Sequence, residues 1–356
     1  YLMDGVRPQA WYDERPGRWI AENDWPGSLT RSVWKLNADS TLTNNRNVSK
    51  TLGITVSSPQ DCGLDGGEYC AIWLGPEMPG DQRSDDARSA CFTSPPISKD
   101  IDIVGAPRLK LALSADKPAA QIAVRLNHVH PDGASTRITY GLLNLAHRHG
   151  FEDAQPIVPG DRFEIDLALD QTAYRVPAGH RLRVAISSTY WPLIWPSPEV
   201  ASLTLYNGAL DLSMRQSGDT DERQFPPPEA ETPWDVEELR PASNSRKIIR
   251  DMATGATTLE IVDDFGCNRD CDHGLVNGSI AREWWSIHPD DPLSATAQTH
   301  WTTENSRGDW SIRTETYASM TSDAGAFHLT ARLEAYEDGN LVFEKNIEQS
   351  VPRDTR

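Results

Sequence analysis

Residues 108–133, RLKLALSADKPAAQIAVRLNHVHPDG, decide the fold. Two segments of this stretch place an apolar residue at every second position, which is the spacing that lines one face of a β-strand. These apolar residues are Leu109, Leu111, Leu113, Ile122, Val124 and Leu126. The PDG at residues 131–133 then ends the second segment with a sequence typical of a tight turn. The stretch therefore predicts two strands that each turn one face to a core.

The same pattern recurs around this stretch at a spacing of roughly 10 to 15 residues, with turn residues between the strands. Residues 137–146 form an extended segment, and apolar residues alternate again over 163–167 and 182–186. The chain also contains 25 Pro, 24 Gly and 12 Trp, which favours short strands and tight turns over long helices. We therefore predict an all-β chain whose residues 31–215 form a jelly-roll β-sandwich.

The N-terminal residues 1–30 have a different character. They are rich in Trp, Pro and Gly and show little periodicity. We expect them to be a linker that packs on a neighbouring domain through Trp11, Trp19 and Trp25. Because the chain starts with Tyr1 and not with Met, we also expect the natural N-terminus to lie upstream.

The C-terminal part divides at a segment rich in proline and acidic residues. Residues 216–245 have the composition of a stiff, solvated connector. Beyond it, alternating apolar residues return, and the EDGN at residues 337–340 separates two segments that predict a β-hairpin. Residues 246–356 are therefore predicted to form a second antiparallel β domain.

Length and charge exclude several classes of protein. With 356 residues the chain is long enough for two domains. Its formal charge of −18 argues against a nucleic-acid partner and against an anionic membrane surface, because both attract basic proteins. No apolar run reaches the length of a transmembrane helix, and no signal peptide is visible. Five irregularly spaced Cys fit a reducing compartment, so we expect a cytoplasmic protein.

The sequence lacks the motif of a serine hydrolase nucleophile. No Ser has the G-x-S-x-G setting that lifts its hydroxyl above the sheet of an α/β-hydrolase, and the nearest approach, GASTR at residues 133–137, lacks the second Gly. Histidines in strand-like surroundings have no such turn nearby: His128, His130, His147, His149 and His180. We therefore expect no complete hydrolytic triad, and no catalytic residue, in this chain.

One acidic segment offers metal ligands. Cys267, Cys271 and His273 could hold three corners of a zinc tetrahedron, but no fourth ligand is apparent. Residues 268–272 alternate Asn and Asp like the start of a calcium loop, although the Gly and the Glu that complete such a loop are out of place. An acidic surface turn is the third interpretation, and we predict no metal site.

Two other groups have both a binding and a packing interpretation. His128 and His130 alternate on one strand face, so both could point at a common ligand, although packing beside the turn is the plainer alternative. Residues 190–196, YWPLIWP, could line a pocket or an interface, or could fill the core. The charged residues within 75–100 suggest internal ion pairs.

Residues 79–133, from PGDQRSDDARSACF to VRLNHVHPDG, resemble the C-terminal domain of the CocE/NonD hydrolases, relatives of cocaine esterase and of the X-prolyl dipeptidyl-peptidases. The resemblance extends over residues 11–215 and is most specific over 81–196. It implies a galactose-binding-like jelly roll. Residues 17–26 look like the family's link out of its hydrolase domain, and 246–356 resemble a β-domain appended in some bacterial members.

This resemblance implies that catalysis and structural support lie in different domains. In the family an α/β-hydrolase domain precedes the jelly roll and supplies Ser, Asp and His, so all three would lie upstream of Tyr1. The parent enzyme would hydrolyse a small ester or amide substrate through an acyl-enzyme, without a cofactor. This chain would be the scaffold and part of the pocket wall. By position, Ile72 and Trp73 would bind substrate, although an ordinary core strand also explains this apolar pair.

The resemblance implies particular partners, and one alternative function stays open beside it. The expected partner is the upstream hydrolase domain of the same polypeptide, and apolar surface that this domain would otherwise cover could lead to a homodimer. The alternative is a free-standing module that binds carbohydrate or another ligand through aromatic side chains, as jelly rolls commonly do. A G-x-S-x-G upstream in the same reading frame would favour the first alternative.

Overall fold

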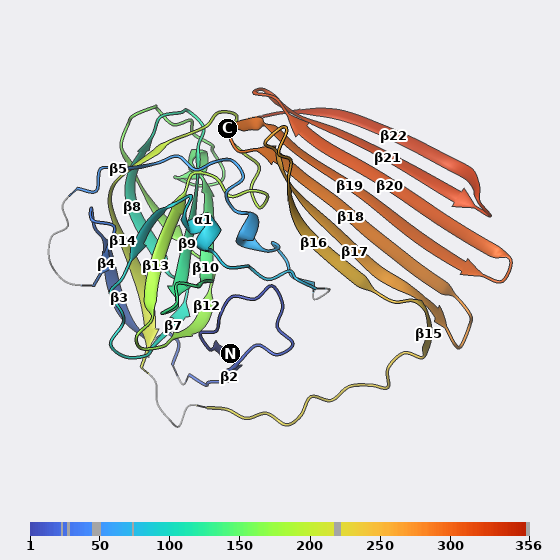
Figure 1. Ribbon diagram of the computed structural model, residues 1–356, viewed down its shortest axis with the longest axis horizontal. Helices are drawn as coiled ribbons and strands as arrows, with labels where there is room; N and C mark the ends of the chain where they lie inside the picture. The colour runs from blue at the N-terminus through green and yellow to red at the C-terminus, as the bar shows by residue number, and fades with distance from the viewer. Residues whose placement is uncertain (23, 27–28, 45–50, 73–74, 217–221, 354–356) are drawn as a thin grey trace. The chain divides into compact units, whose positions relative to one another are not determined.

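The computed structural model describes residues 1–22, 24–26, 29–44, 51–72, 75–216 and 222–353 (Figure 1). Contacts divide the chain into two units: the first contains Tyr1–Glu68 and Met78–Pro226, and the second contains Tyr69–Glu77 and Pro227–Asp354. Strands make up 54% of the chain, which confirms the prediction of an all-β fold. No helix in the described ranges is long and apolar enough to cross a membrane.

The first unit is built from two sheets, of which the larger has ten strands. These are β1 (Leu2–Met3), β2 (Gly17–Arg18), β3 (Leu29–Leu36), β4 (Leu42–Thr43), β5 (Ile54–Val56), β7 (Ile101–Gly105), β8 (Arg108–Ala115), β11 (Phe163–Ala168), β12 (Thr172–Val176) and β14 (Leu203–Arg215). Seven of them follow the order β11-β8-β14-β7-β12-β1-β2, while β3 and β5 pair with β14, and β4 pairs with β3. The N-terminal segment thus contributes two short strands to this sheet.

The smaller sheet has the order β10-β9-β13-β6 and is antiparallel throughout. Its strands are β6 (Ala90–Thr93), β9 (Gln121–Val129), β10 (Ser135–Asn144) and β13 (Arg181–Ser187). Three short helical segments complete the unit: η1 (Leu64–Gly66), α1 (Arg83–Asp86) and η2 (Leu145–His147). These segments lie in the connections between strands and leave the sheets uninterrupted.

The core of the first unit lies between the two sheets. The residues whose alternation predicted β8 and β9 all belong to one buried apolar cluster, together with residues of β13 and β14. They are Leu109, Leu111, Leu113, Ile122, Val124, Leu126, Leu182, Val184, Ile186, Leu203, Leu205, Leu210 and Leu212. Since each fully buried side chain of this size stabilises by about 1.5–3 kcal/mol, this cluster is the main source of the sandwich's stability.

Strand β9 is buried on both faces, which the sequence did not predict. Its second face carries polar residues, including Arg125 and Asn127, that alternate with the apolar ones. Residues 78–89 cover this face, and the Gln82 N–H donates to the Ser135 carbonyl at 2.9 Å. A polar face that is covered by a loop must satisfy its hydrogen bonds and charges inside the protein.

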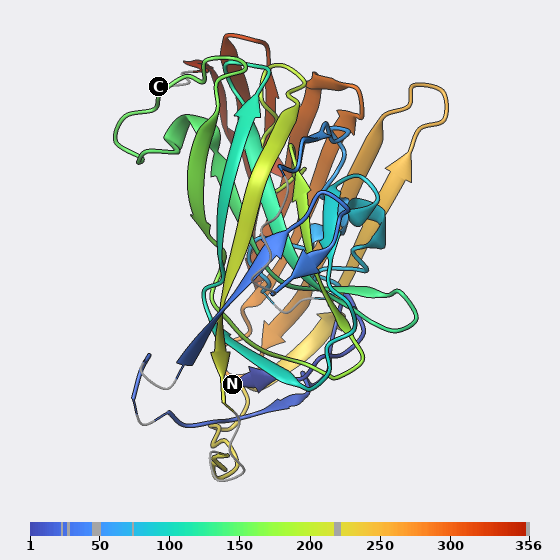
Figure 2. The ribbon, with the colours of Figure 1, turned by 90° about the vertical axis from the view of Figure 1, so that its left-hand side faces the viewer.

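The second unit contains one antiparallel sheet of eight strands, drawn from yellow to red in Figure 1 and turned by 90° in Figure 2. They are β15 (Val236–Arg240), β16 (Ser243–Arg250), β17 (Thr257–Asp270), β18 (Val276–His288), β19 (Asp291–Arg307), β20 (Trp310–Ser322), β21 (Ala326–Glu337) and β22 (Asn340–Pro352). Seven follow the order β15-β17-β18-β19-β20-β21-β22, and β16 pairs with β17. The sheet begins at Val236, inside the segment predicted to be a connector.

The predicted C-terminal hairpin forms from β21 and β22. Asp338 and Gly339 make its two-residue turn with φ of 50° and 80°, and Glu337 pairs with Asn340. A two-residue turn with positive φ at both positions matches the twist of the strands that it joins, and Asp-Gly is a preferred sequence for it. The hairpin prediction is confirmed.

Candidate functional site

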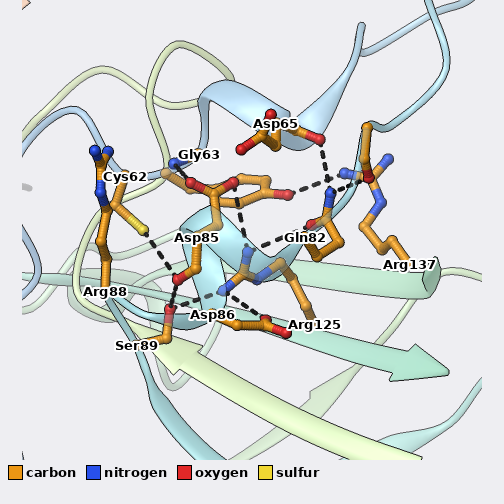
Figure 3. A network of polar contacts seen from close by, with 12 residues as sticks. Cys62, Gly63, Asp65, Gln82, Asp85, Asp86, Arg88, Ser89, Arg125 and Arg137 are labelled. Carbon is orange, nitrogen blue, oxygen red and sulfur yellow. Dashed lines mark hydrogen bonds and ion pairs between the residues drawn. The ribbon is translucent and has the colours of Figure 1, made fainter. Parts of the chain in front are cut away.

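A buried polar network lies on the second face of β9. Figure 3 shows the acidic and polar side chains of residues 82–89 directed at the Arg125 guanidinium. Arg125 Nη1 lies 3.5 Å from Asp85 Oδ2, and Nη2 lies 3.5 Å from Asp86 Oδ1. Nη2 also donates to Ser89 Oγ at 2.7 Å, and Nη1 to Gln82 Oε1 at 3.3 Å. Helix α1 and its flanks are therefore attached to the sheet by a buried charge.

Asp86 links this network to three strands. Its carboxylate accepts hydrogen bonds from Arg183 Nη1, Asn127 Nδ2 and Ser135 Oγ, each at 2.9 Å. These donors lie on β13, β9 and β10. When a buried carboxylate accepts hydrogen bonds from both charged and neutral donors, these bonds offset much of the free-energy cost of its burial. Asp86 thus holds the end of α1 at a fixed position above the small sheet.

The cost of burying the Asp85 carboxylate is offset by fewer hydrogen bonds. Its side chain is fully buried, and Oδ1 accepts the Gly63 N–H at 2.9 Å, while Oδ2 has the Arg125 ion pair but no hydrogen bond. Burial raises the pKa of the Asp85 carboxyl, and the Arg125 charge opposes that rise. Burial, followed by the charge of Asp85, also raises the pKa of Asp65 to about 6. Arg125 is therefore the charged group that most opposes the effect of burial on the Asp85 pKa.

This network contains no hydrolytic nucleophile and base. Ser135, the serine of the GASTR segment, is buried and donates its hydrogen to a carboxylate instead of a histidine. Burial raises the pKa of the Cys62 thiol to about 12, and the nearby Asp85 charge adds to this rise. A thiol with so high a pKa is not a nucleophile at neutral pH. The arrangement can fix loops, and it offers no group for acyl transfer.

One Ser–His–Asp contact occurs in the second unit. His328 Nδ1 lies 3.0 Å from Ser350 Oγ, and its Nε2 lies 2.9 Å from Asp323 Oδ2. In serine hydrolase triads the two ring nitrogens have the opposite partners. Asp323 and Ser350 are exposed, His328 is half-buried, and Asp323 also accepts the N–H groups of Gly325 and Ala326. The contact therefore orders a surface turn.

A second cluster brings three histidines together. His128 and His130 stack with ring centroids 4.0 Å apart, as their alternation on one strand allows, and His180 joins them from the residue before β13. His128 Nε2 lies 2.6 Å from His180 Nδ1, and His128 Nδ1 lies 2.9 Å from the Tyr174 hydroxyl. Burial lowers the pKa of all three rings, that of His128 to about 3. The rings are therefore uncharged at neutral pH.

The two residues predicted to bind substrate are only partly described. Ile72 is 54% exposed, and its N–H donates to Glu77 Oε2 at 2.5 Å. This exposure argues against the alternative that Ile72 belongs to an ordinary core strand. Trp73 lies outside the described residues. The assignment of both residues to a pocket wall stays a prediction.

The cysteine-containing segment forms the turn between β17 and β18. Cys267 is buried within β17, Cys271 is exposed, and the His273 ring lies 3.2 Å from Asp270 Oδ2. Asp270 also accepts the N–H groups of Asp272 and His273. Among the described residues, the three histidines of the first unit are the group whose metal-ligating atoms lie close together. These contacts favour the acidic surface turn over a zinc or calcium site.

The aromatic run at residues 190–196 begins in the core. Tyr190 and Trp191 are fully buried, and Arg137 Nη1 donates to the Tyr190 hydroxyl at 3.0 Å. Gly63 packs against this run with φ of 119°, and a Cβ there would lie 2.6 Å from the Trp191 carbonyl oxygen. The packing interpretation therefore holds for the start of the run.

Exposed aromatic rings meet where Phe225 packs against the N-terminal segment. Tyr1 and Trp19 pack edge to face with centroids 5.2 Å apart, and Trp19 and Phe225 do so at 5.5 Å. The exposed fractions of Tyr1, Trp19 and Phe225 are 40%, 51% and 66%, and that of Trp25 is 57%. Contiguous aromatic surface of this kind is typical of an interface. We call Tyr1, Trp19 and Phe225 the aromatic stack.

Sequence reasoning missed the centre of the network and did not group His180 with His128 and His130. Arg125 lies at a polar position of an alternating strand, which is also the pattern of a solvent-facing residue. The one available signal was the density of charge within residues 75–100, since Asp85 and Asp86 of that loop need counter-charges. His180 is separated from His130 by 50 residues, and no local pattern relates them.

Comparisons with known proteins agree with this architecture. The family described as the X-Pro dipeptidyl-peptidase C-terminal non-catalytic domain matches residues 2–224. A predicted serine esterase of Mycobacterium bovis is 26% identical over 199 residues, which are 48% of this chain and 30% of that protein. Cocaine esterase of Rhodococcus is 23% identical over 186 residues, or 49% and 32% of the two chains. The chain thus spans about a third of the length of these relatives.

Two solved structures have a partial likeness to this chain. An aminopeptidase from a Thaumarchaeota archaeon has a TM-score of 0.47 at 18% identity, over 55% of this chain and 38% of that chain. A CocE/NonD family hydrolase from Staphylococcus aureus has a TM-score of 0.42 at 14% identity, over 59% and 40%. In related proteins the domain normally follows a catalytic α/β-hydrolase domain. The family match covers more than half of this chain, so the chain belongs to the X-Pro dipeptidyl-peptidase C-terminal non-catalytic domain family, homologous to CocE/NonD esterases and X-Pro dipeptidyl-peptidases.

Proposed function

We propose that this chain is the non-catalytic part of a serine hydrolase, in which it supports the catalytic domain and forms part of the wall of the substrate pocket. The parent reaction would be the hydrolysis of a small ester or amide bond, with X-prolyl dipeptides as one substrate class, through an acyl-enzyme. The names of the relatives support this class, since two of them are esterases. The domain needs no cofactor for such a role.

The aromatic stack is the observation that carries this proposal. Two of its three rings, Tyr1 and Trp19, lie on the N-terminal segment, which is the part of the chain that would follow a hydrolase domain. Burial of apolar surface stabilises by about 25 cal/mol per Å², so covering large rings would contribute several kcal/mol to docking. An upstream catalytic domain of the same polypeptide would supply that cover without the entropy cost of bringing two molecules together.

The buried network supports the role of a scaffold. A pocket wall must hold its position when substrate binds, because small displacements of positioning residues cost catalytic rate. Arg125, Asp86 and their partners fix the loop over β9 by contacts to three strands. A loop that is fixed by buried charges resists rearrangement more than a loop that only covers apolar surface.

Labelling of the protein in its native source tests the proposal. A fluorophosphonate probe should modify the catalytic serine, and an antibody against this domain should then detect a labelled species far above 39.5 kDa, the mass of this chain. An unlabelled species near 39.5 kDa would contradict the proposal. Quenching of tryptophan fluorescence by sugars in that species would then support the alternative of a free-standing binding module.

A substitution in the full-length enzyme tests the docking surface. Trp19→Ser should lower the thermal stability of the catalytic domain and the catalytic rate, because it removes the central ring of the aromatic stack. Phe151→Ser is the matched control, since Phe151 is 82% exposed on another loop. Equal, small effects of both substitutions would argue against docking through the stack.

Two further aspects stay predictions. The five cysteines are free thiols, which supports a reducing, cytoplasmic location. The exposed aromatic stack would support a homodimer in a chain that lacks its catalytic domain. Sedimentation analysis of the isolated chain and of Trp19→Ser tests the second of these.

A further inference from the structure

We propose that His128, His130 and His180 form a binding site for a divalent transition-metal ion, and that zinc is the ion that fits it best. His128 lies on β9, His130 directly follows that strand, and His180 directly precedes β13. One metal-ligating nitrogen of each ring lies within 4.8 Å of the others. Three imidazoles that converge on one point are a known protein ligand set for zinc with one open position.

Hydrogen bonds behind the cluster leave suitable nitrogens free. Thr136 Oγ1 donates its hydrogen to the Val6 carbonyl at 2.9 Å, so it accepts the hydrogen of His130 Nε2, 3.0 Å away. His130 Nδ1 therefore keeps its lone pair. The Tyr174 hydroxyl, 2.9 Å from His128 Nδ1, can accept a hydrogen from that nitrogen and leave Nε2 for the metal. Such partners orient metal-binding histidines in proteins.

The spacing of the rings needs only a small adjustment. His128 Nε2 and His180 Nδ1 face each other at 2.6 Å. Two nitrogens bound at about 2.0–2.1 Å to one tetrahedral zinc are about 3.3–3.4 Å apart, so the pair must open by less than about 1 Å. His180 is the ring that can move, because it is half-buried and follows Gly179 in a turn.

The charges near the cluster are mixed, because Arg7 pairs with Asp132 at 2.7 Å while Asp100 lies near His180. Neutral imidazole is the form of histidine that binds a metal. The carboxylates of Asp100 and Asp132 lie near enough to His180 to oppose the fall in its pKa. Because His180 reaches solvent, water can complete the coordination. An all-nitrogen set suits zinc and not calcium or magnesium, which prefer oxygen.

A bound ion would connect parts of the chain that are far apart in sequence. It would join the ends of β9 and β13, and the hydrogen bonds of Thr136 would extend that link to Val6 on the N-terminal segment. Because a metal that binds only the folded state stabilises it, zinc should raise the melting temperature of this chain.

Titration of the chelator-treated chain with zinc tests the proposal. We expect one zinc per chain, measured against a chromophoric chelator, and visible d–d bands of tetrahedral cobalt when Co²⁺ replaces zinc. Loss of a hydrogen-bond partner of a metal-binding side chain weakens metal binding by about 10- to 100-fold. Loss of the metal-binding side chain itself should have a larger effect, so we expect His180→Ala to weaken zinc binding by more than about 100-fold. His149→Ala is the matched control, because His149 is exposed and outside the cluster.

A background of Cys271→Ser removes the exposed thiol near His273 as a competing ligand. Far-ultraviolet circular dichroism would show whether His180→Ala folds, and His180→Gln replaces it if it does not. Thr136→Val should weaken zinc binding by about 10- to 100-fold through His130. Absence of stoichiometric binding, or binding that survives both substitutions of His180, would overturn the proposal and leave three hydrogen-bonded, neutral histidines.

Discussion

Removal of the Arg125 guanidinium is the most direct perturbation of the buried network. Arg125→Met keeps a long apolar stem of similar shape and deletes the charge and its donors. Asp85 would lose its ion pair, and Ser89 and Gln82 would each lose a donor. Asp86 would keep Arg183 and its neutral donors. The loss therefore falls mainly on Asp85, which is fully buried.

Breaking a buried ion pair from one side costs about 3–5 kcal/mol, because a charge remains without a partner. We expect Arg125→Met to lower the free energy of unfolding of the first unit by this amount. Arg83→Met is the matched control, because Arg83 pairs with Asp81 at 2.9 Å at an exposed position. An exposed pair contributes about 0–1 kcal/mol. Urea denaturation followed by circular dichroism and tryptophan fluorescence measures the free energy of unfolding of both variants.

The pH dependence identifies the responsible group. Burial already raises the folded-state pKa of Asp85, and loss of Arg125 would raise it further. A carboxyl whose folded-state pKa exceeds its unfolded-state value of about 3.9 stabilises the fold at low pH and loses that advantage as pH rises. The destabilisation by Arg125→Met should therefore grow from about pH 4 towards neutral pH.

A double substitution completes this test. Arg125→Met with Asp85→Asn removes the unpaired charge, so it should recover part of the lost stability relative to Arg125→Met alone. If Arg125→Met cost no more than Arg83→Met at neutral pH, water would have to reach Asp85, and the reasoning from burial would be wrong.

Three further predictions concern single positions. Asp65→Asn should stabilise the fold above pH 6 by on the order of 1 kcal/mol, because the raised pKa of about 6 means that the ionised carboxyl destabilises the folded state. Thermal melts at pH 4 and 7 measure this difference. Gly63→Ala should destabilise more than Gly160→Ala in urea, since both have positive φ but only Gly63 contacts the Trp191 backbone. In the full-length enzyme, Ile72→Ala should raise KM at unchanged kcat if this side chain binds substrate.

The strands of the sandwich could be predicted because their signal is local. Alternation of Leu109, Leu111 and Leu113 requires only that one face of a strand meets apolar surface, and β8 does so. The Asp338–Gly339 turn is likewise encoded by two residues that accept positive φ. In both cases the residues that determine the structure are neighbours in sequence.

The buried polar face of β9 could not be predicted, because its cover comes from another part of the chain. Arg125 and Asp85 are 40 residues apart, and an arginine in an alternating strand has the same local pattern whether it faces water or a loop. The second sheet also starts earlier than expected, at Val236, because the acidic residues before Arg240 hide its alternation. Charged side chains pair there with the neighbouring strand, as Glu237 does with Arg269.

The segment Tyr69–Glu77 has a consequence for the order in which the protein folds. Its contacts belong to the second unit, and Glu77 Oε1, which is buried, lies 3.8 Å from Arg246 Nη2. A ribosome adds about 5–20 residues per second, so Arg246 follows Glu77 by about 170 residues and about 10–30 s. The large sheet of the sandwich needs β14, so for most of this interval neither unit is complete and the segment stays in water. The native contacts of this segment can therefore form only after β16 has been made, later than the last strand of the first sandwich.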